Sequence, residues 1–400
     1  MMKIHAFAML QILLFFFAFT ISMGLAHADT PMTIYGTFDR ASDDTAAKEP
    51  EGSQFRKGQT IVPQSSITIY GTINVGLRRL SNVNAEGGST LKMSSLGEYY
   101  GNRIGFKGVE DLGDGLNAHF HIEAGFNSGT GALDNKSDRL FNRISSVGMA
   151  GSFGTIDLGR QPSVAVKTVY AYEPFRFRYV YIIPLAGAAA GDVAGRVNRP
   201  FGTTDGPRFS NGVQYFGKFN NFTVGTEYIF GEASGDNNAG SAKALGLSYK
   251  SDPFVIGGAV TRHEPNVATA GKSADYQAQN QFTYGAAYEA GALRLAGGYM
   301  RTDTDTGSLR RTQQTQNLWL GGSYEFTPTI SLTAGHYRTT LSGDLVGRRD
   351  LTILSVTYAL SQWTNLYAEI DHATLTGVAS LAVGGQSKQL GISTGINHAF

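Results

Sequence analysis

Three short patterns in this 400-residue chain contain residue types that do chemistry in other proteins. Residues 391–395, Gly-Ile-Ser-Thr-Gly, fit the G-x-S-x-G pattern of a hydrolase, and His119-x-His121 puts two imidazoles on one strand face, as a metal site could. Glu110-Asp111 pairs two carboxylates. The serine lies inside an expected strand with no helix after it, no third metal ligand is evident, and the acidic pair precedes a Gly-rich turn. The sequence therefore predicts no enzyme, no cofactor and no metal site.

Fixed charge in the longest connection, residues 161–207, is the other chemical feature. A connection this long usually has a function. It carries five cations against three acids, a balance of +2 (five minus three): Lys167, Arg176, Arg178, Arg196 and Arg199 against Glu173, Asp192 and Asp205. Such charges act together only if other elements hold them around one space.

Composition limits the class of protein and the kind of secondary structure that could hold these charges. Charged residues make up 16% of the chain and the net charge is +1, which argues against a nucleic-acid binder. The absence of cysteine removes disulfides and thiolate chemistry. With 51 Gly, 19 Tyr and 24 Phe, and no long helical pattern after residue 28, the chain is expected to be all-β.

The first 28 residues have the pattern of an export signal. Lys3 precedes an apolar run at 12–19, and Ala26-His27-Ala28 fits a cleavage site. We predict a mature protein that starts at Asp29; the alternative is an uncleaved membrane anchor, because the apolar stretch is long. No later window is apolar enough for a transmembrane helix.

A tyrosine recurs before each tight turn of the second half. The intervals between successive tyrosines are 34, 39, 36 and 34 residues by subtraction, which indicates an internal repeat: Tyr215, Tyr249, Tyr288, Tyr324 and Tyr358. Tight turns at 251–253, 290–292 and 327–329 alternate with long polar stretches. Transmembrane barrels have this asymmetry, with short periplasmic turns and long outer loops, and the tyrosines would then form a periplasmic aromatic belt.

Period-two alternation supports strands, although a soluble sandwich shows the same period. We predict sixteen antiparallel strands in a transmembrane β-barrel, an even number that leaves both ends on the periplasmic side. They lie near 66–78, 102–111, 116–126, 142–150, 155–161, 208–218, 222–230, 243–250, 254–263, 280–289, 293–301, 315–325, 330–338, 350–359, 363–372 and 387–400.

The stretch TIYGT occurs at 33–37 and again at 68–72. If both copies formed barrel strands, the count would be seventeen and every later strand would reverse direction. We therefore predict that the second copy opens the barrel domain, 64–400. The first belongs to an N-terminal extension, 29–63, which is expected to be poorly ordered.

Several segments resemble the general porins of Gram-negative bacteria, of the neisserial and β-proteobacterial type. They include GNRIGFKGVEDLGDGLNAHFHIEAGF (101–126), GSFGTIDLGRQ (151–161), RFSNGVQY (208–215) and the terminal GISTGINHAF (391–400). The resemblance implies a homotrimeric outer-membrane channel for ions and small hydrophilic solutes, with the long third extracellular loop folded into the lumen. It also implies that Phe400 is part of the signal for the outer-membrane assembly machinery. The extension 29–63 and the divergent third loop depart from the family pattern.

From this resemblance the charges of 161–207 become candidates for a constriction, because a pore selects by width and by charge at its narrowest point. Strand parity adds Arg103 and Lys107, and Arg78, Arg143 and Arg160 lie near strand ends. The cationic excess favours anions. Alternatives are that these charges are solvated loop surface, and that the barrel is non-conducting, as an adhesin or a plugged, substrate-specific channel.

Overall fold

The structure is a computed structural model that describes residues 66–94, 99–135, 138–180, 182–186, 207–264, 278–305 and 312–400. The predicted signal peptide (1–28) and extension (29–63) lie outside these residues. So do four of the predicted site residues: Asp192, Arg196, Arg199 and Asp205. No helix within the described ranges is long and apolar enough to cross a membrane.

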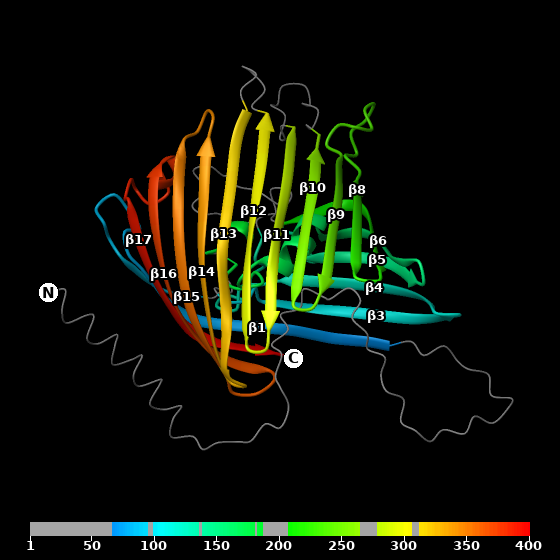
Figure 1. Cartoon of the computed structure of the whole chain (residues 1–400), viewed down its shortest axis with the longest axis horizontal. Helices are drawn as coiled ribbons and strands as arrows, with labels where there is room; N and C mark the ends of the chain where they lie inside the picture. The colour runs from blue at the N-terminus through cyan, green and yellow to red at the C-terminus, as the bar shows by residue number, and fades with distance from the viewer. Residues whose placement is uncertain are drawn as a thin grey trace. The chain divides into compact units, whose positions relative to one another are not determined.

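The described residues form one antiparallel sheet of seventeen strands with short helical segments between them. Figure 1 shows strands β10 to β16 side by side along its wall. The strands are β1 (Ser66–Leu80), β2 (Thr90–Ser94), β3 (Arg103–Gly113), β4 (Leu116–Gly125), β5 (Ile144–Gly151), β6 (Gly154–Pro162), β7 (Arg208–Phe219), β8 (Phe222–Ile229), β9 (Ala242–Ser251), β10 (Phe254–His263), β11 (Gln279–Ala290), β12 (Leu293–Asp305), β13 (Thr312–Thr327), β14 (Ile330–Ser342), β15 (Gly347–Ala359), β16 (Thr364–Gly377) and β17 (Lys388–Ala399). The helical segments are α2 (Val164–Val169), η1 (Tyr170–Tyr172), η2 (Pro184–Ala186) and α3 (Val378–Leu381).

The sheet closes on itself, because β1 pairs with β17 from Thr72↔Ala399 to Leu80↔Gly391 and with β3 from Ser66↔Val109 to Thr72↔Arg103. Backbone hydrogen bonds between Gly71 and Phe400, 2.9 and 3.0 Å long, complete the seam. Sixteen of the strands form this closed barrel, as predicted. Closure leaves no sheet edge, so every strand of the barrel has a partner on both sides.

One strand was not expected. The sequence predicts no strand between 66–78 and 102–111, but β2 lies there and pairs with the second half of β1, from Gly76↔Ser94 to Leu80↔Thr90. It forms a hairpin on the barrel and does not belong to the closed ring. Five residues with little alternation gave no sequence signal for it.

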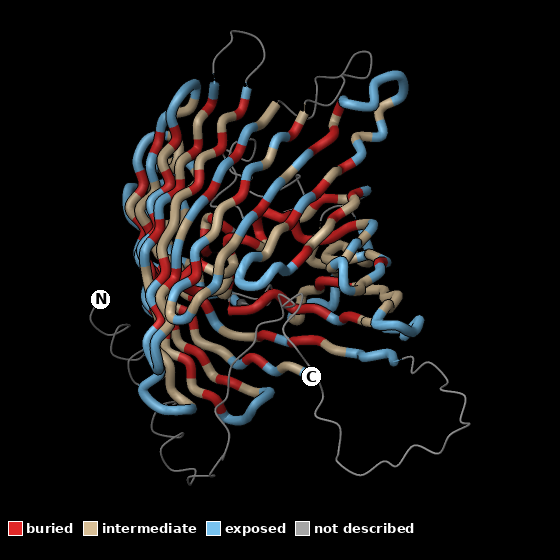
Figure 2. Tube along the Cα trace, turned by 45° about the vertical axis from the view of Figure 1, so that its right-hand side comes forward, coloured by how far each residue is buried: buried red, intermediate tan, exposed pale blue. Residues whose placement is uncertain are grey.

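Most strands have one outward, largely apolar face and one face turned to the interior, and exposure alternates clearly along strands such as β12 to β16 (Figure 2). In β14, Tyr337 is buried and packs against an interior segment, while its neighbours His336 and Arg338 are exposed. Large exposed apolar side chains on many strands form the outer surface, among them Ile69, Leu247, Leu320, Leu354 and Ile396. A soluble protein would bury such a surface, whereas a barrel in lipid exposes it.

Candidate functional site

The part of the long connection that follows β6 begins with α2, which is fixed to the inner wall at its start. The Ser163 hydroxyl accepts a hydrogen bond from the Val166 amide (3.3 Å), and the Glu227 carboxylate of β8 accepts one from the Val164 amide (3.1 Å). The Lys167 ammonium donates to Gln161 (3.1 Å) and to Gln214. The first two bonds satisfy amides that a helix start leaves unpaired. The predicted lining residue Lys167 is bound to two glutamine side chains at the wall.

Two wall glycines allow the connection to lie close against the strands. A Cβ at Gly246 of β9 would lie 2.6 Å from the Thr168 hydroxyl, and one at Gly285 of β11 would lie 2.2 Å from the Tyr172 ring. Each stands three residues before a recurrent tyrosine, Tyr249 or Tyr288. Because side chains alternate, the glycine of this G-x-x-Y pattern faces inward while the tyrosine faces outward.

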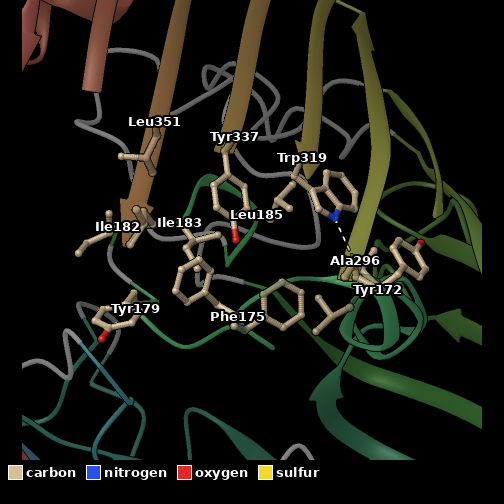
Figure 3. Close-up of a cluster of buried hydrophobic side chains, with 14 of the residues drawn as sticks. Tyr172, Phe175, Tyr179, Ile182, Ile183, Leu185, Ala296, Trp319, Tyr337 and Leu351 are labelled. Carbon is tan, nitrogen blue, oxygen red and sulfur yellow. Dashed lines mark hydrogen bonds between the residues drawn. The ribbon is translucent and has the colours of Figure 1, made fainter. Parts of the chain in front are cut away.

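Aromatic residues hold the next part of the connection against β11, β13 and β15 (Figure 3). The Tyr172 ring lies parallel to that of Trp319 at 6.0 Å, and the Trp319 indole donates to the Tyr172 carbonyl (3.0 Å). Further along, the Tyr179 hydroxyl pairs with Ser355 (2.5 Å), and its amide donates to the Tyr99 carbonyl (2.9 Å). Tyr172 and Tyr179 are fully buried, and we call the described residues 163–180 and 182–186 the inner segment.

Glu173 and Arg294 secure the turn of this inner segment. The Glu173 side chain is fully buried; its carboxylate accepts hydrogen bonds from the Tyr337 hydroxyl and from the Phe177 amide (2.7 Å). Burial raises the pKa of Glu173, and these two hydrogen bonds oppose that rise. From β12, the Arg294 guanidinium donates to the carbonyls of Glu173 (3.0 Å) and Ala171 (2.9 Å). Glu173, which the sequence analysis expects to line the constriction, is therefore buried between the inner segment and the barrel wall.

The two predicted arginines of the inner segment differ in their surroundings. Arg176 is about one-third exposed and bridges to Glu289 of β11 (2.9 Å). Arg178 donates to the Tyr99 hydroxyl (3.0 Å) and to the Phe175 carbonyl (3.2 Å). Arg176 is thus paired with a carboxylate, whereas the Arg178 guanidinium lies 5.7 Å from the centre of the Tyr99 ring.

A second group of charges lies on a different arc of the closed sheet, at β3 to β7. Arg143 donates to Glu123 (2.5 Å), and Arg160 donates to the Asn142 carbonyl (2.6 Å) and to Ser210 (2.8 Å). Electrostatic interactions connect four guanidiniums with one carboxylate, a balance of +3 (four minus one): Arg103, Arg143, Arg160 and Arg208 with Glu123. We call these five residues the arginine cluster.

Sequence reasoning anticipated three members of this cluster and missed Arg208 and Glu123. Glu123 shares strand parity with His119 and His121, and this was the signal that it faces inward. Arg208 is the first residue of β7 and directly follows the long connection, so strand alternation did not indicate which way its side chain points.

The remaining predicted wall cations lie apart from the arginine cluster. Arg78 is buried and contacts Asp371 (2.8 Å), Glu369 (3.3 Å) and Ser393 (2.8 Å), which places it at the β1–β17 seam. The Lys107 ammonium lies 4.8 Å above the centre of the Tyr70 ring, a cation–π geometry.

The enzyme-like patterns have no catalytic geometry. His119 pairs with Asp157 (2.8 Å) and His121 pairs with Tyr70, so the two imidazoles do not converge. Ser393 lies inside β17, and Asp111 accepts the Gly113 amide (2.9 Å) as a turn residue. Among the described residues no group of three His, Asp or Glu side chains could hold a metal ion.

The five predicted belt tyrosines lie on the outward face, each near the end of its own strand that leads into a tight turn. Four of them pair with the first residue of a neighbouring strand, as in Phe222↔Tyr249 and Phe254↔Tyr288. Other exposed aromatic side chains at the same turns extend the set: Phe153, Phe219, Phe326 and Trp363. At the C-terminus, the Phe400 ring lies over Gly71 of the second TIYGT copy, where a Cβ would meet it at 2.4 Å.

Comparison with known proteins shows extensive similarity. The family model described as Gram-negative porin matches residues 18–377. An outer membrane porin protein of Bordetella pertussis is 26% identical over 399 aligned residues, covering 84% of this chain and 95% of the relative. The major outer membrane protein P.IB of Neisseria lactamica is 26% identical, covering 76% and 87%. The solved structure of an anion-selective porin from Comamonas acidovorans superimposes with a TM-score of 0.68 at 23% identity, covering 84% and 100%.

Proposed function

Because the chain belongs to the family of Gram-negative porins, which form outer-membrane channels for passive diffusion, we propose that its own channel favours anions. The arginine cluster carries this proposal, since it gathers a formal charge of +3 on one arc of the interior. Fixed charge at a narrow point sets the sign of the ions that a pore conducts. The similar structure from Comamonas acidovorans is described as anion-selective, which supports the same preference.

The inner segment is the second wall of the proposed constriction. It packs against the inward faces of β9 to β16, while the arginine cluster lies on β3 to β7. Solutes would pass between these two arcs of the ring. The inner segment, anchored by Glu173 and by its aromatic residues, would keep the width constant, and Arg176 and Arg178 would add positive charge from that side.

The remaining features of the channel follow from the resemblance to the family. We propose a homotrimer in outer-membrane lipid, exported through the signal at 1–28. Its periplasmic rim would be marked by the belt tyrosines. Recognition of Phe400 by the assembly machinery belongs to the same proposal.

Single-channel recording of refolded protein under a salt gradient tests the ion preference. We expect conducting steps that close in thirds and a reversal potential of the anionic sign. Arg143→Gln and Arg160→Gln should move that potential toward the cation side, because each removes one positive charge from the cluster. Arg262→Gln is the matched control, since this arginine of β10 is exposed on the outer face.

Two results would contradict the proposal. A cation preference in the unmodified channel would overturn the sign. A folded and inserted protein that never conducts would overturn the diffusion pore itself, and deletion of 29–63 would then test for a plug. Heat-modifiable mobility on a gel shows for each variant that the barrel has formed.

A further inference from the structure

Charged side chains occur on the outward face of the barrel at a regular height. Arg262, Arg301 and Arg338 each stand eight residues after the first residue of their strand (Phe254, Leu293 and Ile330, by subtraction), and Asp350 stands eight before Tyr358. Their neighbours in sequence face the interior: Tyr337 packs on the inner segment, and Leu351 is buried in the same aromatic cluster. The charges themselves therefore face the membrane.

The depth of this row can be estimated from strand geometry. Eight residues span about 27 Å along a strand, which is about 20 Å along the membrane normal for a tilt of about 40°. The apolar band of such barrels is about 25 Å tall. Starting from the periplasmic aromatic belt, the row lies near the opposite boundary, at the headgroups of the outer leaflet. Charge is tolerated there, because its cost falls from about 2–4 kcal/mol at the midplane to about 0–1 near the interface.

At two of the charged sites the arginine is bound by a carboxylate two residues further along the chain. Arg262 binds Glu264 through two bonds, Nε–Oε1 at 2.9 Å and Nη2–Oε2 at 3.0 Å. Arg301 binds Asp303 at 3.0 and 3.1 Å. Each guanidinium therefore has its own carboxylate. Lys243 stands opposite Arg262 and Asp305 also interacts with Arg262, so the two sites together hold three cations and three acids.

The third site is not balanced. Asp350 accepts hydrogen bonds from the Nε atoms of both Arg338 (2.7 Å) and Arg348 (2.5 Å). The side chains of the two arginines are 44% and 48% exposed, and among the described residues their Nη groups have no protein acceptor. Lys388 of β17 lies in the same register row, through Asp350↔Thr374 and Thr374↔Lys388. We call Arg338, Arg348, Asp350 and Lys388 the outer basic patch; its formal charge is +2 (three minus one).

We propose that the outer basic patch binds a phosphate group of a phosphorylated glycolipid in the outer leaflet. Asp350 holds both guanidiniums by their Nε atoms and leaves the Nη donors for an anion, and arginine binds phosphate in this two-bond geometry. Below the patch, exposed Leu320 and Leu354 offer an apolar surface to the acyl chains. Headgroup depth, charge and apolar contact together favour a lipid over a soluble anion. This proposal is independent of the ion preference of the channel.

The experiment titrates refolded full-length protein in detergent with bis-phosphorylated lipid A and with the dephosphorylated lipid, and counts bound lipid by native mass spectrometry. We expect the phosphorylated form to bind more tightly. The double variant Arg338→Gln/Arg348→Gln should weaken its binding about tenfold or more, because charged hydrogen bonds are lost. The control, Arg262→Gln/Arg301→Gln, changes the two neutral sites at the same height and should bind as the unmodified protein does.

Several outcomes would overturn the proposal. Equal binding of the two lipid A forms would show that phosphate is not recognised, and an equal loss in the control would show that any outer charge suffices. Binding of phosphatidylglycerol or inorganic phosphate as tight as that of lipid A would exclude the glycolipid as the specific occupant. If the double variant fails to fold, Lys388→Gln alone should still weaken binding by a smaller factor, and unchanged binding would count against the patch.

Discussion

At the scale of single residues, the interior contains charges that are matched by partners and charges that are in excess, and members of both groups are buried. Glu173, Arg294 and Arg78 are buried and matched by partners, so they stabilise the inner segment or the barrel seam. The arginine cluster has four cations around one acid. An unequal ratio of this kind leaves a net field, whereas a matched pair cancels its own.

The buried Glu173 predicts a pH dependence for the inner segment. Its pKa is raised in the folded protein, so the folded state binds the proton more tightly than the unfolded chain does. The anchoring contribution is therefore complete below the pKa of the unfolded chain and is lost as the pH rises through the folded value. Current noise from loop movement should increase as the pH rises above the ordinary range of a glutamate pKa, about 4–5.

Glu173→Gln is the test of that assignment, because the amide stays neutral and can still pair with Tyr337 and the Phe177 amide. The noise of this variant should be nearly independent of pH. If it rose with pH as steeply as in the unmodified protein, another group would be responsible.

At the scale of elements, the repeat G-x-x-Y does two tasks with one pattern. Tyr288 on the outer face lies next to Phe254 at 5.3 Å, and Gly285 on the inner face leaves room for Tyr172. A strand has two faces of alternating residues, and an odd spacing assigns the two residues to opposite faces. The repeat thus places an aromatic side chain on the outer face and leaves room for the inner segment on the inner face.

Gly285→Ala should displace the inner segment, since the new Cβ would lie 2.2 Å from the Tyr172 ring. Overpacking of this kind costs about 1–3 kcal/mol. We expect altered single-channel conductance and more frequent closures in planar bilayers. Ala286→Val is the control on the adjacent outward position, and it should conduct as the unmodified channel does; the same change in both variants would show that the effect is not specific to the segment.

Most of the barrel could be predicted from the sequence, because alternation and turn chemistry are local. The sixteen strands and the turn at 251–253 needed no tertiary information. The inner segment could not be predicted in the same way. Its turn has left-handed backbone at Arg176, Phe177 and Tyr179, all non-glycine residues, and only the packing of distant strands accounts for it. For the same reason Glu173 was expected to line the lumen.

At the scale of the whole molecule, the apolar surface faces outward and the aromatic core lies within the ring, against the inner segment. The barrel needs lipid around it, and the inner segment needs the finished wall. Since the segment touches strands from β9 to β16, it can find its place only after most of the ring has formed.

Phe400 offers a test of assembly. Phe400→Ala keeps the backbone bonds to Gly71 but removes the ring that covers it. We expect near-normal refolding in detergent and a strong loss of folded protein in the outer membrane of cells, measured by heat-modifiable mobility in both settings. An equal loss in both would show that the ring acts in barrel closure and not as an assembly signal.

The seam between β1 and β17 also sets the order of events in time. Thr72 pairs with Ala399, so the contact that closes the ring joins residues more than three hundred positions apart. Long-range pairing of this kind slows folding, because the entropy of closing the chain is lost before the pairing rewards it. Until β17 pairs with it, a folded β1 therefore has an unpaired edge. An open edge of this length invites pairing with other chains, and the unfinished protein depends on being shielded during that interval.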